Sequence, residues 1–147
     1  MCLPPLRLLA AFLVLSFLAA LSARSEQVVF GEINYFPTGT KPEFIEVQNI
    51  TMTPLDIAKW SFTNGITFNF PDFNSGSPQA HFLKAKERIV LSSADEAATR
   101  AAYPAIPLAV RVFGPWVGTL NNDGERITLE DKNGVPVCTV GYGDGGR

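Results

Sequence analysis

The sequence predicts an all-β domain, an antiparallel sandwich or barrel with one short helix. Short runs of β-branched and aromatic residues alternate with polar residues at a period of two, which is the pattern of half-buried strands. Turn residues separate these runs at intervals of about 8 to 12 residues. A helical pattern occurs once, and its side chains are too small to organise a core. The chain of 147 residues has the length of a single domain.

The strand pattern is clearest near the C-terminus. Ile127 and Leu129 alternate with polar neighbours, as expected of a strand with one buried face. Asn133-Gly134 follows, the pair that most readily takes the positive φ angles of a tight hairpin turn. The chain returns through residues 135–142, which are rich in valine, threonine and tyrosine. With a short strand expected at 116–120, these segments predict an antiparallel meander of three strands.

The earlier part of the chain supplies the remaining elements. Further strands are expected, in order, at 27–35, 43–49, 55–57, 59–64, 66–70, 89–91 and 108–113. Asn64-Gly65 predicts a hairpin between two of them. The helix is expected to begin at Ser93, with Glu96 completing a capping box, and to end at Pro104. We expect this helix to be a surface crossover.

Residues 1–24 have the features of a secretory signal peptide. Arg7 precedes the almost wholly apolar stretch 8–21, and small residues follow, so cleavage is expected between Ser22 and Ser25. The apolar stretch is shorter than the roughly 20 residues that span a bilayer, and an uncleaved anchor is the alternative. We therefore expect a mature domain at 28–147 that is exported to the periplasm, the cell surface or the medium, with no transmembrane span after cleavage.

Cysteine usage and charge exclude several classes of protein. The mature chain keeps one cysteine, Cys138, which cannot form an internal disulfide and is predicted to be a buried, unreactive thiol. Acidic residues outnumber basic ones by 14 to 12, and no basic block exceeds 84–88. Nucleic acid is therefore not an expected partner. Asn49-Ile50-Thr51 is a glycosylation sequon, which matters only in a host that glycosylates exported chains.

Several segments, by their order and spacing, resemble the lamin tail domain family, whose fold is a small immunoglobulin-like β-sandwich. They are Gly31-Glu-Ile-Asn34, Glu43-Phe-Ile-Glu-Val-Gln-Asn49, 54–64, 68–71, 87–91 and Gly118-Thr-Leu-Asn-Asn-Asp-Gly-Glu-Arg-Ile-Thr-Leu-Glu-Asp-Lys-Asn-Gly134, with Tyr142-Gly-Asp144. The resemblance covers nearly the whole mature chain. It implies an immunoglobulin-like antiparallel β-sandwich with one short crossover helix.

The same resemblance implies a non-catalytic module. An export signal stands in place of a coiled-coil rod, so the chain looks like the bacterial exported members, in which the domain tethers or binds. Family members usually continue past the Tyr-Gly-Asp segment into a Trp-Pro turn and a further strand. The resemblance therefore implies a domain truncated at its C-terminal strand, the N-terminal part of a larger secreted or surface protein.

The sequence does not favour an enzyme. His81 is the only histidine, and one histidine with one cysteine cannot complete a zinc site. Glu32, Glu43 and Glu46 lie on the first two expected strands and form a candidate oxygen-ligand site for calcium, or an acid/base pair. The alternative is that they are ordinary charged residues on a wet strand face. No other cofactor is expected.

Aromatic residues provide the candidate ligand-binding positions. Tyr35, Phe36, Phe73 and Trp116 are flanked by glycine, proline or asparagine, as in loops at the ends of a sandwich, and Trp116 is also a candidate core residue. Such aromatic side chains stack on sugar rings or pack against a protein partner. The predicted function is an exported binding or tethering module whose partner is a protein or a cell-surface polysaccharide. The alternative is a carbohydrate-binding accessory module of a secreted hydrolase.

Overall fold

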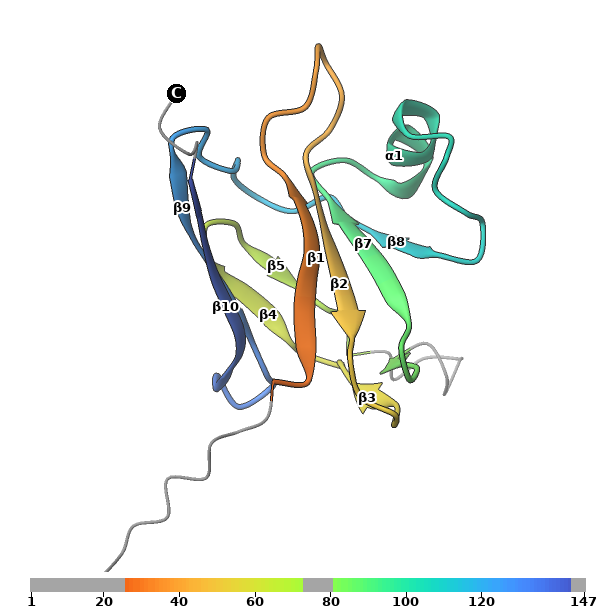
Figure 1. Ribbon diagram of the computed structural model, residues 1–147, viewed down its shortest axis with the longest axis vertical. Helices are drawn as coiled ribbons and strands as arrows, with labels where there is room; N and C mark the ends of the chain where they lie inside the picture. The colour runs from red at the N-terminus through yellow and green to blue at the C-terminus, as the bar shows by residue number, and fades with distance from the viewer. Residues whose placement is uncertain (1–25, 73–80, 144–147) are drawn as a thin grey trace, which may run out of the picture.

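Two facing β-sheets make up the domain (Figure 1). The computed structural model describes residues 26–72 and 81–143; the expected leader, Phe73 and residues 144–147 lie outside these ranges. The elements are β1 (Val28–Asn34), β2 (Phe44–Asn49), β3 (Leu55–Asp56), β4 (Ser61–Asn64), β5 (Phe68–Asn69), β6 (Phe82–Leu83), β7 (Arg88–Ser92), α1 (Glu96–Ala102), β8 (Arg111–Phe113), β9 (Gly124–Glu130) and β10 (Pro136–Gly143).

The sheet order confirms an immunoglobulin-like β-sandwich. One sheet runs β1-β2-β7-β8, the facing sheet runs β10-β9-β4-β5, and β3 pairs with β6 in a small separate sheet. Every named strand pair is antiparallel except β7 and β8, which are parallel because α1 lies in the crossover between them. Within the described ranges, no helix is long and apolar enough to cross a membrane.

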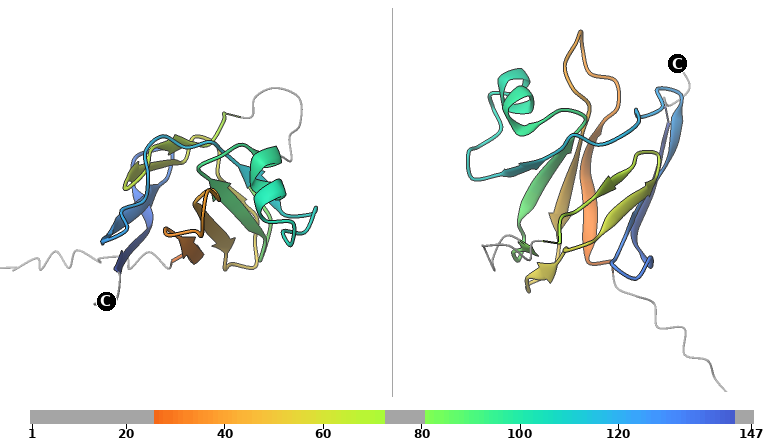
Figure 2. Two further views of the ribbon diagram at one scale, coloured as in Figure 1. Left: turned by 90° about the horizontal axis from the view of Figure 1, so that it is seen from above. Right: turned by 180° about the vertical axis from the view of Figure 1, so that it is seen from behind.

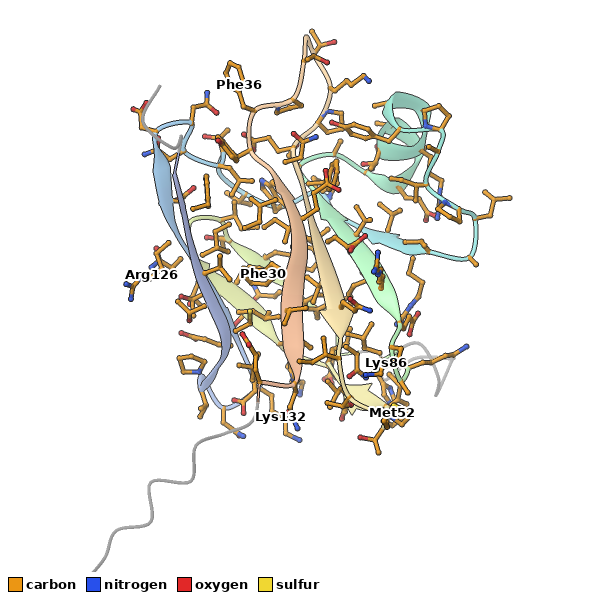
Figure 3. The ribbon with its side chains drawn as sticks, in the orientation of Figure 1. Phe30, Phe36, Met52, Lys86, Arg126 and Lys132 are labelled. Atoms are coloured by element: carbon orange, nitrogen blue, oxygen red, sulfur yellow. The ribbon has the colours of Figure 1, made fainter. Side chains whose placement is uncertain are left out.

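The core lies between the two sheets. Alternate residues of each main strand point inward and are almost completely removed from water, so each contributes about 1.5 to 3 kcal/mol to stability. The inward residues include Ile45, Val47, Phe62, Ile89, Leu91, Ile127 and Leu129. The rings of Phe30 and Phe62 stack at 5.7 Å and join the two sheets, and Phe30 lies in the middle of the molecule in Figure 3.

A β-bulge in β1 changes which residues face the core. The pairing of β1 with β2 shifts between Phe30 and Glu32, so the residue between them, Gly31, has no partner. Residues two apart in a regular strand point to the same face. Because of the bulge, Phe30 packs on the core, whereas Glu32 lies on the outer face. A side chain at Gly31 would meet the carboxylate of Glu46, which would then have to move.

Helix α1 covers part of the outer face of the first sheet (Figure 2). Thr99 of α1 is fully buried, and its hydroxyl donates a 2.8 Å hydrogen bond to the Ser92 hydroxyl, which in turn donates to the carbonyl of Glu43. This chain of hydrogen bonds joins the helix to β7 and β2. It explains why Val90 and Ser92, which do not face the core, are buried as well.

The helix begins later than the sequence indicated. Its N-cap is Asp95, whose carboxylate accepts a 2.8 Å hydrogen bond from the amide of Ala98, and the predicted capping box at Ser93 and Glu96 is wrong. Ser93 still belongs to the ladder with β2, because its amide donates to the Glu43 carbonyl and its hydroxyl accepts from the Glu43 amide. The chain is therefore free to turn into a helix only after this residue.

The other predicted strands are present, although those expected at 59–64, 66–70 and 108–113 are shorter, and there is one exception. Residues 116–120 are not a strand; Val117 forms an isolated bridge with Thr67 through two 2.9 Å backbone hydrogen bonds. This segment crosses from the first sheet to the second and buries Trp116, so it cannot follow one strand neighbour. The two-stranded β3-β6 pairing was not expected at β6.

The β9–β10 hairpin is present, but its turn differs from the one expected. Gly134 has a φ of 73°, whereas Asn133 is not among the residues with positive φ. The Gly134 amide donates to the Asp131 carbonyl, and the Asp131 carboxylate accepts from the amides of Asn133 and Val135. The aspartate thus caps a wider turn, which needs positive φ only at the glycine.

Asn49 organises the end of the molecule where β2 stops. Its side chain is fully buried, and its amide nitrogen donates to the carbonyls of Thr53, Leu83 and Lys84 at 2.8 to 3.0 Å. Its amide oxygen accepts hydrogen bonds from Thr51. The nitrogen that a glycan would modify is therefore already enclosed, so the sequon is inaccessible in the folded domain.

We predict that Asn49→Ala lowers the free energy of unfolding by about 2 to 4 kcal/mol, because buried carbonyls lose their donor. Urea denaturation of the two proteins measures the difference. Asn69→Ala, at an exposed position of β5, is the matched control and is expected to change stability by less than about 0.5 kcal/mol. Equal stability of the Asn49→Ala variant and the wild type would contradict this role.

Candidate functional site

A groove of about 420 Å³ lies on the outer face of the first sheet, between the strands and the segment that follows α1. We call it the outer-face groove. Residues from β1, β2 and β7 form its floor, and the chain after α1 forms its wall. The lining residues are Glu32, Lys41, Phe44, Glu46, Val90, Ala102, Tyr103, Pro104, Ala105, Ile106 and Pro107.

The register of three strands builds the floor of the outer-face groove. Glu46 is paired with Glu32 on one side and with Val90 on the other, so these three residues form one row across β1, β2 and β7. The next row holds Phe44, which is paired with Asn34 and Ser92. Because the outward side chains of paired residues stand side by side, the floor combines two carboxylates with an aromatic ring and an aliphatic side chain.

Tyr103 holds the wall of the groove against this floor. Its hydroxyl donates to the Pro42 carbonyl at 2.7 Å and accepts from the side-chain amide of Asn34 at 3.1 Å. Its ring meets Phe44 edge-on with centroids 5.1 Å apart, and the Lys41 ammonium lies 5.3 Å from the ring centroid. Burial raises the pKa of the Tyr103 hydroxyl, so it stays protonated and remains a donor near neutral pH.

Among the described residues, two acidic and two basic side chains meet at the groove, but only one pair of them is in ion-pair contact. Glu32 and Glu46 stand opposite each other, and Arg88 reaches Glu46 with 3.4 Å between Nη1 and Oε1. Glu32 is exposed and has no ion-pair partner in the part of the chain that the structure describes. Lys41 lies over the Tyr103 ring. The groove therefore offers carboxylate oxygens beside an apolar wall.

A second polar cluster closes one end of the sandwich. The Tyr142 hydroxyl lies 2.9 Å from Glu125 Oε1 and 3.0 Å from the Asn121 carbonyl, and the Tyr142 ring packs on Tyr35 with centroids 4.7 Å apart. Burial, the hydrogen bond to Glu125 and its charge raise the pKa of Tyr142 far above its ordinary value. This cluster fastens β10 to β9 and to the loop after β1, which is a structural task.

Glu43 belongs to this end cluster and not to the groove. Its carboxylate accepts a 3.0 Å hydrogen bond from the amide of Leu120. Burial raises the pKa of Glu43, and the nearby charge of Glu125 adds to the increase, against the lowering effect of the Leu120 amide. Successive residues along a strand point to opposite faces of the sheet. Glu43 lies two residues before the inward residue Ile45 and so points inward, whereas Glu46 points outward.

The structure does not bring the three predicted metal ligands together. Glu32 and Glu46 meet on the outer face, but Glu43 is turned toward Leu120 on the opposite side of β2. Across residues 26–72 and 81–143, no three His, Cys, Asp or Glu side chains gather closely enough to hold a metal ion. The grouping of Glu43 with the other two glutamates is therefore wrong. His81 packs against the Phe82 ring at 4.2 Å.

The predicted aromatic positions do not form one surface either. Trp116 is 5% exposed and belongs to the core, and Tyr35 is half-buried against Tyr142. Phe36 lies in the loop after β1 (Figure 3) and is 58% exposed, and Phe73 lies outside the described residues. The interpretation of Trp116 as a core residue is confirmed, and its ring offers no face for a ligand.

Sequence reasoning missed the residues that shape the groove. The sequence predicts Phe44 only as part of a strand and places Tyr103 at the end of the helix, before Pro104. The signal that could have found the wall is the spacing of Pro104 and Pro107 around Ile106, because this spacing prevents helix continuation and keeps apolar residues together after α1.

The architecture is that of an immunoglobulin-like β-sandwich module, and the sequence comparison agrees with it. Residues 22–144 match the sequence profile of the Lamin Tail Domain family. The chain therefore belongs to the lamin tail domain family, an immunoglobulin-like family of non-catalytic domains. No curated protein shows a significant match to this sequence.

Cys138 lies in the core, as predicted. It is 3% exposed, and burial, together with the negative charge of Glu26, raises the pKa of its thiol to about 11. Because the thiolate is the reactive form, both effects protect the residue from modification. The same shift makes the folded state lose stability as the pH rises from about 9 toward 11, since the unfolded chain then releases its proton more readily.

We predict that Cys138 in the chain from residue 26 onward reacts with Ellman's reagent at pH 8 at least about a hundredfold more slowly when folded than in urea. The release of thionitrobenzoate measures both rates. In that chain Cys138 is the sole thiol, so no second site contributes. Equal rates in the folded and unfolded protein would show that the thiol is accessible.

Proposed function

We propose that this chain is an exported binding or tethering module of the lamin tail type, and that its partner docks in the outer-face groove. The groove carries the proposal: it is mostly apolar, holds an aromatic pair, and places a few charged groups at its floor, as ligand sites do. The signal-peptide pattern at residues 1–24 supports export to the medium or the cell surface.

The groove is preformed, which suits a tether. Its floor is a three-stranded section of sheet, and its wall is fixed by the hydrogen bonds of Tyr103 and by the buried Thr99–Ser92 contact. A site that needs little ordering loses less conformational entropy when a partner binds, so a modest contact area gives useful affinity. A tether must hold its partner without chemistry, and this arrangement serves that purpose.

A protein partner fits the groove better than a polysaccharide. Sugar-binding sites use open aromatic faces, but both tryptophans, Trp60 and Trp116, are buried. The Tyr103 ring is already engaged by Phe44 and Lys41. The apolar wall around Ile106, with carboxylates opposite, resembles a protein-binding groove. The experiment below must therefore distinguish a protein partner from the carbohydrate partner of the alternative role.

We predict that the purified mature chain binds to envelope preparations of its host and that Ile106→Asp weakens this binding at least about tenfold, because a charge enters the apolar wall. Sedimentation with labelled protein measures retention. Val117→Asp, at a 73% exposed position outside the groove, is the control and should bind like the wild type.

Enzymatic treatment of the envelopes separates the kinds of partner. Protease treatment of the preparation should remove the binding sites, and digestion of its polysaccharides should leave them. Loss of binding only after polysaccharide digestion would favour the carbohydrate-binding alternative. Retention of Ile106→Asp at the wild-type level would place the partner elsewhere on the domain. Circular dichroism of both variants shows whether each is folded.

A further inference from the structure

We infer that the outer-face groove takes a single arginine or lysine side chain of a protein partner, with its cationic end at Glu32 and Glu46 and its aliphatic part along the apolar wall. This inference rests on the proposed function and names the chemistry that its groove recognises. It follows from the pairing of the two glutamates, from the cations around them and from the wall that faces them.

Two carboxylates of like charge face each other on the outer face of the first sheet. Glu32 and Glu46 are direct partners across β1 and β2, and their side chains stand on the same face within the groove. Like charges in this position destabilise a strand pair. The bulge at Gly31 turns Glu32 outward, and the absence of a side chain at Gly31 leaves room for the Glu46 carboxylate. Local geometry thus brings the two carboxylates to one place.

Two cations, Arg88 and Lys41, lie at the groove, but in the part of the chain that the structure describes only Arg88 is ion-paired with one of the carboxylates. Arg88 contacts Glu46 at 3.4 Å, but more than half of its side chain is exposed, so it can shift as another cation binds. Lys41 lies over the Tyr103 ring, and the remaining lining residues, from β7 and from the chain after α1, are uncharged. Two carboxylates therefore share one ion-paired cation. Glu32, which has no ion-pair partner within the described ranges, is the carboxylate that an incoming cation meets.

The wall of the groove is apolar and matches the aliphatic part of a long basic side chain. Val90, Ile106 and the prolines Pro104 and Pro107 are apolar, and the rings of Phe44 and Tyr103 complete the surface. A long basic side chain matches both parts, since its methylene groups lie along apolar surface while its charged end reaches the carboxylates. A calcium ion does not match, because it takes six to eight oxygen ligands and two carboxylates beside an apolar wall do not supply them.

The test uses two synthetic peptides that differ in one charge. Both have the sequence acetyl-Gly-Pro-Leu-X-Leu-Pro-Gly-amide, with X arginine in one and citrulline, its neutral isostere, in the other. Titration into the ¹⁵N-labelled mature chain, followed by amide chemical shifts, gives each dissociation constant. We expect the arginine peptide to bind at least about tenfold more tightly, with shifts confined to β1, β2 and residues 102–107.

Matched variants assign this preference to the two glutamates. Glu32→Gln and Glu46→Gln should each reduce the preference for arginine, and the double variant should abolish it. Glu130→Gln, on the facing sheet, should leave it unchanged. Glu32 is exposed and makes no ion pair within the described ranges, so Glu32→Gln is expected to fold even if Glu46→Gln does not.

Several results would overturn the inference. Equal affinity for the arginine and citrulline peptides would remove the role of charge, and a preference that survives in the Glu32→Gln variant would remove the role of this site. Saturable shifts around Glu32 and Glu46 on addition of calcium chloride alone would show that a metal ion is the ligand. If Ile106→Asp loses envelope binding while the peptides bind equally, the proposed function stands and this inference fails.

Discussion

Strand β2 is hydrogen-bonded to a neighbour on each side, β1 and β7, and its alternation sets both faces of the first sheet. Ile45 and Val47 point into the core, whereas Phe44 and Glu46 point outward and become the floor of the groove. A shift of one residue in this register would bury the carboxylate and expose the core side chains. The core and the floor of the groove therefore depend on the same strand pairing.

The outer face of a two-sheet sandwich is normally wet, and its charged residues are then unremarkable. In this domain the crossover between β7 and β8 lies on that face, and the buried Thr99–Ser92 hydrogen bond and the Tyr103 hydroxyl hold it there. The result is a sheltered strip beside Glu32 and Glu46. The opposite end, where Tyr142, Glu125 and Glu43 are hydrogen-bonded within the fold, is polar as well, but its groups already have partners.

The sequence predicted the sandwich because alternation within a strand is a local property, visible in pairs such as Ile127 and Leu129. It did not predict the groove, whose residues Glu32, Phe44 and Tyr103 come from three separate segments. The bulge at Gly31 moved Glu32 to a face that simple counting did not give it. The sequence left Trp116 as a candidate for both the core and a loop, because a turn-like neighbourhood does not show whether a side chain points inward. It placed Glu43 near Glu46 on one strand, but the two side chains point to opposite faces of the sheet.

The groove exists only while Tyr103, at the start of the segment after α1, lies against β1 and β2. Nuclear Overhauser contacts in the mature chain measure this most directly. We expect cross-peaks from the Tyr103 ring protons to the Phe44 ring and to the side-chain amide of Asn34. A Tyr103 ring without contacts to either residue, in a domain whose core contacts are intact, would contradict it.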